Sequence, residues 1–284
     1  MNFWERRRRN PCFWGLHAGP GRYLNWFLAL VPFAVLVSVY LIASDIRLKE
    51  NPDYKYLPSV MKMAEAVKEL VATEDLRTGH YILLQDTLSS LRRLGMGMAL
   101  AALSALFLGL NQGCFPGFRA LLLPFTKFLS IVPPLAILPI LLVAFGVHET
   151  VKVVLIFIGT AWVMSLDVHL AACKLPKEHI TKALTLGASP LGVVYRVVFP
   201  QVMPRLIESV RLSLGPAWLF LLAAEAFAAS EGLGYRIYLV RRYQAMDVII
   251  PYVLLITFLG FAADWLLRTY MRWKYPWYFV VRES

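Results

Sequence analysis

The sequence predicts an all-α integral membrane protein with about six transmembrane helices. Of its 284 residues, 58% are hydrophobic and only 17% are charged, and the mean hydropathy is +0.59. Soluble domains carry roughly 25% charged residues. Apolar stretches of about twenty residues, the length that crosses the hydrocarbon of a bilayer, recur along the chain. A single membrane domain is the simplest organisation for this length.

The first candidate span runs from Leu24 to Ala43 and contains no charged residue. It is longer than the apolar region of about 7–15 residues in a cleaved signal peptide, so we expect it to be retained. Arg6, Arg7, Arg8, Arg9 and Arg22 precede it. Because positive charge collects on the cytoplasmic side, these arginines predict a cytoplasmic amino terminus.

The polar stretch 44–80 is then expected on the outer side. Pro58 and Ser59 open a predicted helix within it. The apolar face of that helix consists of Val60, Ala64, Val67 and Val71. Such a helix lies along the outer membrane surface or packs on the spans, and the sequence leaves both arrangements open.

Three further spans are predicted at about 83–110, 121–145 and 151–172, separated by turn-rich stretches at 111–117 and 146–150. The middle span is broken by Pro133, Pro134 and Pro139. These prolines free backbone carbonyls that neighbouring helices or water must satisfy.

The stretch 174–204 is rich in lysine and arginine and is expected in the cytoplasm. Then follow a fifth span at about 206–229, an outer loop at 230–247 and a sixth span at about 248–267. The basic tail after the sixth span is expected in the cytoplasm, so both termini lie on that side. Arg236, Arg241 and Arg242 in the outer loop run against this charge bias. They either attract an anionic solute or acidic partner surface, or belong to a solvated loop.

Two short helices are predicted in the cytoplasmic stretch between spans four and five. Pro176 suits the start of the first helix, and Gly187 suits its end because glycine accepts a left-handed backbone conformation. Ser189 caps the second helix with Pro190 at its first position, and Pro200 is expected to stop it. Both helices are too short to cross a bilayer, so their apolar faces need a cover.

This stretch resembles the cytoplasmic "EAA" loop of binding-protein-dependent ABC importer permeases. That loop reads Glu-Ala-Ala, three residues, Gly, nine residues, Ile-x-Leu-Pro. The matching stretch here is Thr181-Lys182-Ala183, three residues, Gly187, nine residues, Val197-Val198-Phe199-Pro200. Thr181 stands where the glutamate usually stands, and Glu178 lies one turn earlier.

Three flanking stretches are similar to one branch of the family, the nitrate/sulfonate/taurine/bicarbonate permeases. They are Ser90-Leu91-x-Arg93, the run from Ile131 to Pro139, and Ala224-Glu225 followed by Ser230 to Tyr235. The similarity covers roughly 81–277. It implies a permease core at 81–277 between an amino-terminal segment at 1–80 and a cytoplasmic tail at 278–284.

The resemblance implies a type I ABC importer permease fold in the bacterial inner membrane. It also implies a homodimer that binds two cytosolic ATP-binding subunits and a periplasmic solute-binding protein. The implied solute is a small anion such as a sulfonate, taurine, nitrate or bicarbonate. The chain has no Gly-x4-Gly-Lys-Ser/Thr phosphate loop, so ATP and Mg are expected in the partner and no cofactor in this chain. The residues implied to contact the ATPase are Glu178, Thr181, Ala183, Gly187, Ala188, Val197 and Pro200.

Glu225 is the main candidate within the membrane. An acid in a span is costly unless it faces a partner or a watery path, so Glu225 is either a pathway or gate residue or a structural pair within the subunit. Asp167 and Asp264 lie nearer the cytoplasmic ends of their spans. His169 and Cys173, at i and i+4, lack further ligands, so no metal site is expected. Cys12 and Cys114 are, like Cys173, expected as small apolar fillers.

Two other function classes compete with the permease. A secondary transporter or channel that works without ATP would need ionisable relays in several spans or two repeated halves, and the sequence indicates neither. An integral-membrane enzyme would need a converging catalytic cluster, which is also not indicated. The basic residues lie between apolar runs and not on one polar face, which argues against nucleic acid as a partner.

Overall fold

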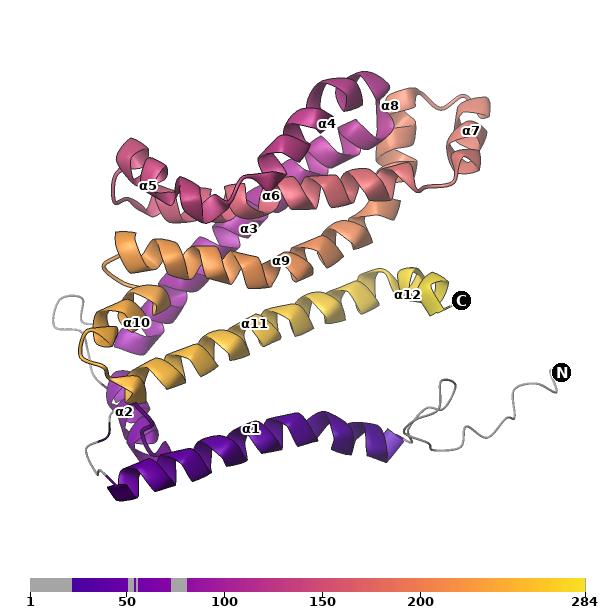
Figure 1. Cartoon of the computed structure of the whole chain (residues 1–284). Helices are drawn as coiled ribbons and strands as arrows, with labels where there is room; N and C mark the ends of the chain where they lie inside the picture. The colour runs from indigo at the N-terminus through magenta and orange to yellow at the C-terminus, as the bar shows by residue number, and fades with distance from the viewer. Residues whose placement is uncertain (1–21, 51–53, 55, 73–80, 284) are drawn as a thin grey trace. The chain divides into compact units, whose positions relative to one another are not determined.

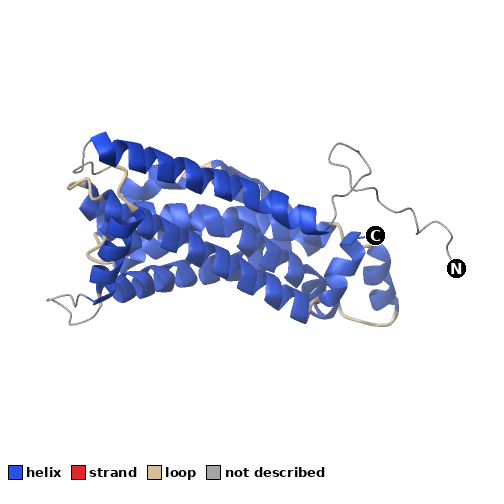
Figure 2. Ribbon diagram, turned by 90° about the horizontal axis from the view of Figure 1, so that it is seen from below, coloured by secondary structure: helices blue, strands red, loops and turns tan. Residues whose placement is uncertain are grey.

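The computed structural model describes residues 22–50, 54, 56–72 and 81–283. Within these residues the chain forms twelve α-helices and one π-helical turn (Figure 1). Figure 2 shows short connections between them. The arginines at positions 6–9 and Cys12 lie outside the described residues. The helices are α1 (Arg22–Glu50), α2 (Val60–Ala72), α3 (Ile82–Cys114), α4 (Pro116–Ile131), α5 (Pro134–Phe145), α6 (Glu149–Cys173), α7 (Lys177–Thr185), α8 (Pro190–Val193), η1 (Val194–Val198), α9 (Phe199–Ala228), α10 (Leu233–Arg241), α11 (Met246–Lys274) and α12 (Pro276–Glu283).

Five helical segments in the described part of the chain are long and apolar enough to cross a membrane. They are 23–50, 82–114, 149–173, 190–228 and 246–274. The pair α4 and α5 makes a sixth if the two helices together count as one span. The all-helical, multi-span class predicted from the sequence is therefore confirmed.

The chain divides into two compact units, residues 1–64 and 65–284. In the first unit, the Tyr40 hydroxyl donates to the Pro58 carbonyl at 2.8 Å and the Ser44 hydroxyl donates to the Leu57 carbonyl at 3.1 Å. These bonds hold the segment before α2 against α1. The Ser59 hydroxyl accepts from the Lys62 amide at 3.3 Å, which confirms the predicted start of this helix.

Glycines on α3 bring that helix close to α6 in the second unit. A Cβ added to Gly97 would lie 2.7 Å from the Ile156 Cβ, and one added to Gly109 would lie 2.6 Å from the Ser165 carbonyl oxygen. Small residues allow helix backbones to approach closely within a membrane. On α6, Gly159 receives the ring of Phe220 from α9 in the same way. The buried core therefore consists mainly of α3, α6 and α9.

The third predicted span is not one continuous helix. α4 ends at Ile131, α5 begins at Pro134, and their axes differ by 95°. Val132 and Pro133 have extended backbones, because a residue that precedes a proline is biased away from the helical region. Pro139 lies inside α5 and does not end it. The pair is a broken span or a re-entrant loop.

The prediction that Pro200 stops the second short helix is wrong. The helix continues from Pro190 through η1 into α9, so residues 190–228 form one segment. In the π-helical turn the Phe199 amide bonds to the Val194 carbonyl, five residues back. This wider turn lies directly before Pro200, which has no amide hydrogen to give to the residue four positions earlier. The fifth span therefore carries α8 as its own extension.

Two stretches predicted as loops are partly helical. Residues 230–247 contain α10, and α3 continues through Cys114 into the stretch 111–117. Leu233, at the first position of α10, is fully buried. Packing of this apolar residue against the other helices explains why the segment is folded back and not extended into solvent.

Gly109→Ala tests the close approach of α3 and α6. The added methyl group has no space, so we expect the free energy of unfolding to fall by about 1–3 kcal/mol. The measurement is thermal unfolding of the purified protein in detergent. The control is Gly95→Ala, since nothing lies within 4 Å of a Cβ there. Equal stabilities of the two variants would contradict the packing described here.

Candidate functional site

The short helix α7 and the bend after it carry five of the seven residues that the sequence singled out for coupling. Glu178, Thr181, Gly187 and Ala188 are exposed, and Ala183 is half-buried. The Thr181 hydroxyl donates to the Lys177 carbonyl at 3.0 Å. This side chain is therefore satisfied within its own helix, and it does not reproduce the free carboxylate of a glutamate.

Gly187 ends α7 with a φ of +84°. The Ala188 amide bonds to the Ala183 carbonyl at 3.1 Å, and the Gly187 amide bonds to the Leu184 carbonyl at 3.0 Å. This pair of bonds is a Schellman motif, which needs a left-handed residue and therefore favours glycine. The predicted glycine bend is confirmed.

Beyond the bend, the Ser189 hydroxyl accepts from the Gly192 amide at 3.1 Å and caps α8, as predicted. Of the two remaining coupling candidates, Val197 is half-buried in η1 and Pro200 is exposed in the first turn of α9. Large apolar side chains project from this region into solvent. Leu186 is 88% exposed and Leu191 is 60% exposed. Such a surface is suited to burial against another protein.

Glu225 lies at the opposite end of the bundle, where α3 and α6 begin and α9 ends, here called the α10 end. It is fully buried. Arg93 Nη1 donates to Glu225 Oε1 at 2.8 Å, the Ser90 hydroxyl donates to the same oxygen at 2.8 Å, and the Gly234 amide donates to Oε2 at 2.8 Å. The structure therefore places Glu225 in an ion pair within the subunit. Its role in a pathway stays a prediction.

Arg93 connects three parts of the chain at this end and is only 2% exposed. It binds both carboxylate oxygens of Glu149 at the start of α6, and Nη1 donates to the Glu231 carbonyl at 2.8 Å. Lys152, also 2% exposed, binds Glu149 from one turn further along α6. Each buried cation thus has a carboxylate partner, as burial of charge requires.

A second buried carboxylate, Asp86, extends this network. It accepts from the Gly232 amide at 2.9 Å, from Arg236 Nε at 2.8 Å and from the Tyr252 hydroxyl at 3.2 Å. Arg236, expected in a solvated loop or on a docking surface, is therefore drawn into the bundle. We call the group Asp86, Arg93, Glu149, Lys152, Glu225, Glu231 and Arg236 the charge clamp.

Sequence reasoning missed the charge clamp, although one signal for it was present. Asp86, Ser90 and Arg93 follow one another at i, i+4 and i+7, which places all three on one face of a helix. Polar residues on one face of an apolar span indicate partners within the bundle. Those partners lie more than fifty residues away in sequence, and no local pattern reveals them.

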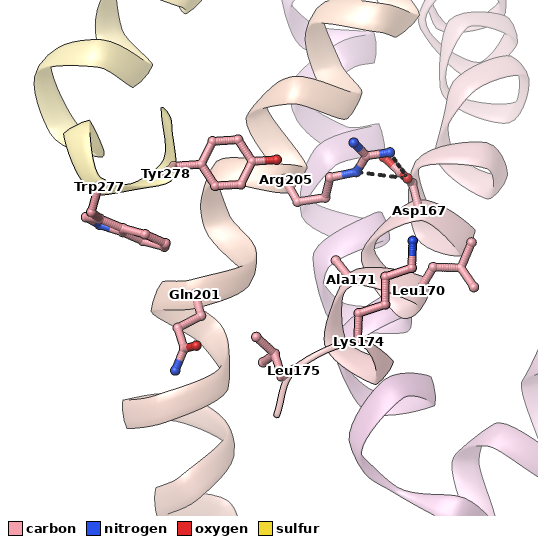
Figure 3. Close-up of a pocket in the computed structure, with 9 residues that line it drawn as sticks. All are labelled: Asp167, Leu170, Ala171, Lys174, Leu175, Gln201, Arg205, Trp277 and Tyr278. Carbon is pink, nitrogen blue, oxygen red and sulfur yellow. Dashed lines mark hydrogen bonds and ion pairs between the residues drawn. The ribbon is translucent and has the colours of Figure 1, made fainter. Parts of the chain in front are cut away.

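A second set of ion pairs lies near the end where α6 ends and α7 begins, here called the α7 end. Arg205 Nε donates to Asp167 Oδ1 at 3.0 Å, and Nη1 donates to Glu208 Oε2 at 3.1 Å. The Tyr278 hydroxyl donates to the same Glu208 oxygen at 2.8 Å. Burial, together with the hydrogen bond to Glu208, raises the pKa of Tyr278. A cavity of about 520 Å³ adjoins these residues (Figure 3).

Residues 97–273 match the family described as the binding-protein-dependent transport system inner membrane component. The chain belongs to this family. The permease is 28% identical over 251 residues to the taurine transport system permease protein TauC of Escherichia coli (strain K12), covering 88% of this chain and 90% of that protein. It is also 28% identical over 189 residues to the bicarbonate transport system permease protein CmpB of Synechococcus elongatus, covering 66% and 68%. These relatives match the nitrate/sulfonate/taurine/bicarbonate branch.

Solved structures of importers share the fold of the permease. A bacterial alginate ABC transporter, crystallised with its alginate-bound periplasmic protein, gives a TM-score of 0.61 at 12% identity, covering 88% of this chain and 95% of that one. The MetNI methionine ABC transporter in an inward-facing conformation gives 0.53 at 19% identity, covering 64% and 93%. The predicted type I importer permease fold is thus confirmed.

Cys173 and His169 of the permease lie close together, with 3.9 Å between the sulfur and the ring nitrogens. Arg119 Nη2 donates to the Cys173 sulfur at 3.3 Å. Within the described ranges, no group of three or more His, Cys, Asp or Glu residues is placed to hold a metal ion.

Asp264, the other acid near the cytoplasmic ends of the predicted spans, binds Arg211 at 2.8 Å and Arg268 at 3.3 Å. The bond to Arg211 joins α9 to α11.

Arg93→Met tests the charge clamp. The substitution leaves Glu225 buried without its cation, so we expect a loss of about 3–5 kcal/mol in the free energy of unfolding. Adding Glu225→Gln should restore part of that loss, because the unpaired buried charge is then removed. Thermal unfolding in detergent provides the measurement.

The matched control for this test is Arg47→Met, because Arg47 pairs with Glu50 in solvent, with side chains 56% and 62% exposed. Exposed pairs contribute about 0–1 kcal/mol. A loss at position 93 no larger than at position 47 would contradict the clamp.

Proposed function

We infer that this permease is the transmembrane subunit of an ATP-driven importer for a small anionic solute. It forms the translocation pathway and couples to a separate ATPase through the loop 174–200. The observation that carries this proposal is the α7–α8 pair, which has an ordered bend at Gly187 and uncovered apolar side chains at its tip.

The shape of the α7–α8 pair supports a role in docking. Ile180 and Leu184 turn toward α8 and the end of α3, where they line a cavity of about 250 Å³ together with Val193 and Val194. This face of α7 therefore lies toward the bundle, while Leu186 and Leu191 point away from it into solvent. An ATPase that binds these exposed side chains can move α8, and with it α9, as a rigid body.

The family supports the sidedness and the partners of the proposal. We place the α7 end and both termini in the cytoplasm of a bacterial cell, and the α10 end outside. The proposed assembly is a homodimer of this subunit with two ATP-binding subunits, which use ATP and Mg, and a periplasmic solute-binding protein. The alginate transporter, which shares this fold, was crystallised with such a periplasmic protein.

The solute class rests on two relatives, a permease for taurine and one for bicarbonate. Both solutes are small and carry an anionic group. A sulfonate, taurine, nitrate or bicarbonate is the proposed cargo. The solute-binding protein is expected to make the first selection among them.

One observation favours the competing function, a transporter or channel that works without ATP. The charge clamp places ionisable groups within several spans, as a proton or ion relay requires. However, Arg93, Lys152, Glu225 and Asp86 each bind a partner of opposite charge in the described structure. Satisfied pairs of this kind fit a structural clamp better than a relay. Uptake that persists after deletion of the ATPase gene would support the competing function.

Gly187→Val tests the coupling loop. A β-branched residue is strained at a φ of +84°, so the bend should open and α7 should lose its orientation. We expect solute uptake and co-purification of the soluble ATPase to fall by about tenfold or more, which corresponds to roughly 1.4 kcal/mol of lost interaction. The amount of protein inserted in the membrane should stay unchanged.

The control for Gly187→Val is Gly117→Val, at a helical glycine with nothing within 4 Å of an added Cβ. That variant should retain uptake and ATPase binding. A Gly187→Val protein that binds the ATPase and transports like the control would refute the proposed coupling.

A further inference from the structure

Two cavities meet at the ion pair between α6 and α9. The first, of about 520 Å³, opens near the α7 end and is lined by Lys174, Gln201 and the aromatic residues of α12 (Figure 3). The second, of about 400 Å³, lies deeper along α9 beside Ser209 and Ser213. Asp167, Leu170 and Arg205 line both cavities. The two cavities are therefore adjacent, with this salt bridge between them, and we call them together the groove.

The α9 wall of this groove is a polar stripe. Gln201, Arg205, Ser209 and Ser213 follow at intervals of four residues, which puts them on one helix face. The hydroxyls of Ser209 and Ser213 have no hydrogen-bond partner in the part of the chain that the structure describes. On α6 the groove extends from Lys174 to Val163, about 16 Å along the helix axis. That length is about half of the roughly 30 Å hydrocarbon layer.

The Asp167–Arg205 pair is partly exposed and leaves one carboxylate oxygen without a donor. Both bonds from Arg205 end on Asp167 Oδ1, and Oδ2 accepts no hydrogen bond from any described residue. Asp167 is 19% exposed and Arg205 is 35% exposed, so both can be reached from the groove. By contrast, Arg93 and Glu225 in the charge clamp are 2% and 0% exposed. The groove pair is therefore more accessible than the Arg93–Glu225 pair.

The far side of Arg205 is held in place independently of Asp167. Glu208 binds Arg205 Nη1 at 3.1 Å and is itself held by the Tyr278 hydroxyl. In Figure 3 the Tyr278 ring lies beside Arg205, and the Lys174 side chain points toward Asp167. Arg205 can thus turn two of its nitrogens from Asp167 to a solute without losing its position.

We propose that this groove is a solute-binding station, and that its paired charges favour a small zwitterion with an anionic group and an ammonium group. The inference rests on the proposed transport function and narrows its solute class. A sulfonate or carboxylate accepts the Arg205 hydrogen bonds, while the ammonium group donates to Asp167. The serine hydroxyls give further donors to the anionic end.

Charge balance decides between a zwitterion and a simple anion. A zwitterion replaces one ion pair by two, so no charge in the groove loses its partner. A simple anion takes Arg205 away from Asp167 and leaves that carboxylate without its ion-pair partner. Because an ionised group without a partner is costly away from bulk water, the simple anion binds less well.

The test compares two probes that differ in one group, taurine and ethanesulfonate, which lacks the ammonium. Binding of radiolabelled taurine to the purified full-length permease in nanodiscs is measured at equilibrium, with ethanesulfonate as competitor. We expect wild type to prefer taurine by about tenfold or more, the scale of a lost hydrogen bond between charged groups. Asp167→Asn should reduce this preference to near unity, and Arg205→Gln should abolish binding of both.

The matched control is Asp264→Asn, which breaks a different ion pair of α9, the one with α11, and lines neither cavity. It should keep the wild-type preference. Absence of taurine binding, or equal preferences in Asp167→Asn and Asp264→Asn, would overturn the inference. If these results came with intact ATPase binding and ATP-driven uptake, the proposed function would stand and only the binding station would fail.

Discussion

Arg93 imposes the constraint on which the rest of the bundle depends. A guanidinium group that is 2% exposed among apolar helices is stable only when acceptors surround it. Glu149 and Glu225 supply them from the start of α6 and the end of α9, and the Glu231 carbonyl supplies another from the turn before α10. The α10 end of the core is thereby fixed, and the glycine contacts between α3 and α6 continue this rigidity along their length.

The two ends of the core differ in a way that suits alternating access. At the α10 end, Asp86, Arg93, Lys152 and Glu225 are buried, and each has a partner of opposite charge. At the α7 end, the Asp167–Arg205 pair borders a groove, and α7 and α8 project apolar residues into solvent. Since α8 continues through η1 into α9, a displacement of α8 would act directly on the helix that carries Arg205. The proposed coupling loop and the proposed solute-binding groove therefore share one continuous helical segment, residues 190–228.

Much of the fold was predictable because its signals are local. Apolar length identified the spans, and the caps at Ser59 and Ser189 and the bend at Gly187 follow from single-residue preferences. The errors arose where tertiary packing overrides a local rule. Pro200 did not end its helix, because a π-helical turn accommodates it. Arg236 was expected either to attract an anionic solute or partner or to lie in a solvated loop, yet it binds Asp86, 150 residues earlier in the chain. The charge clamp and the groove depend on such distant pairs, which sequence spacing does not reveal.

The most direct test of this account is the sidedness of the α7–α8 pair. In a variant without native cysteines, Leu186→Cys and Tyr243→Cys each place one thiol at a position that is 88% or 72% exposed, at opposite ends of the second unit. With a membrane-impermeant maleimide on intact cells, we expect labelling at position 243 and none at 186 until the membrane is opened. Labelling of position 186 in intact cells would put α7 and α8 on the outer side of the membrane, where a cytosolic ATPase cannot bind them, and would contradict the proposed coupling.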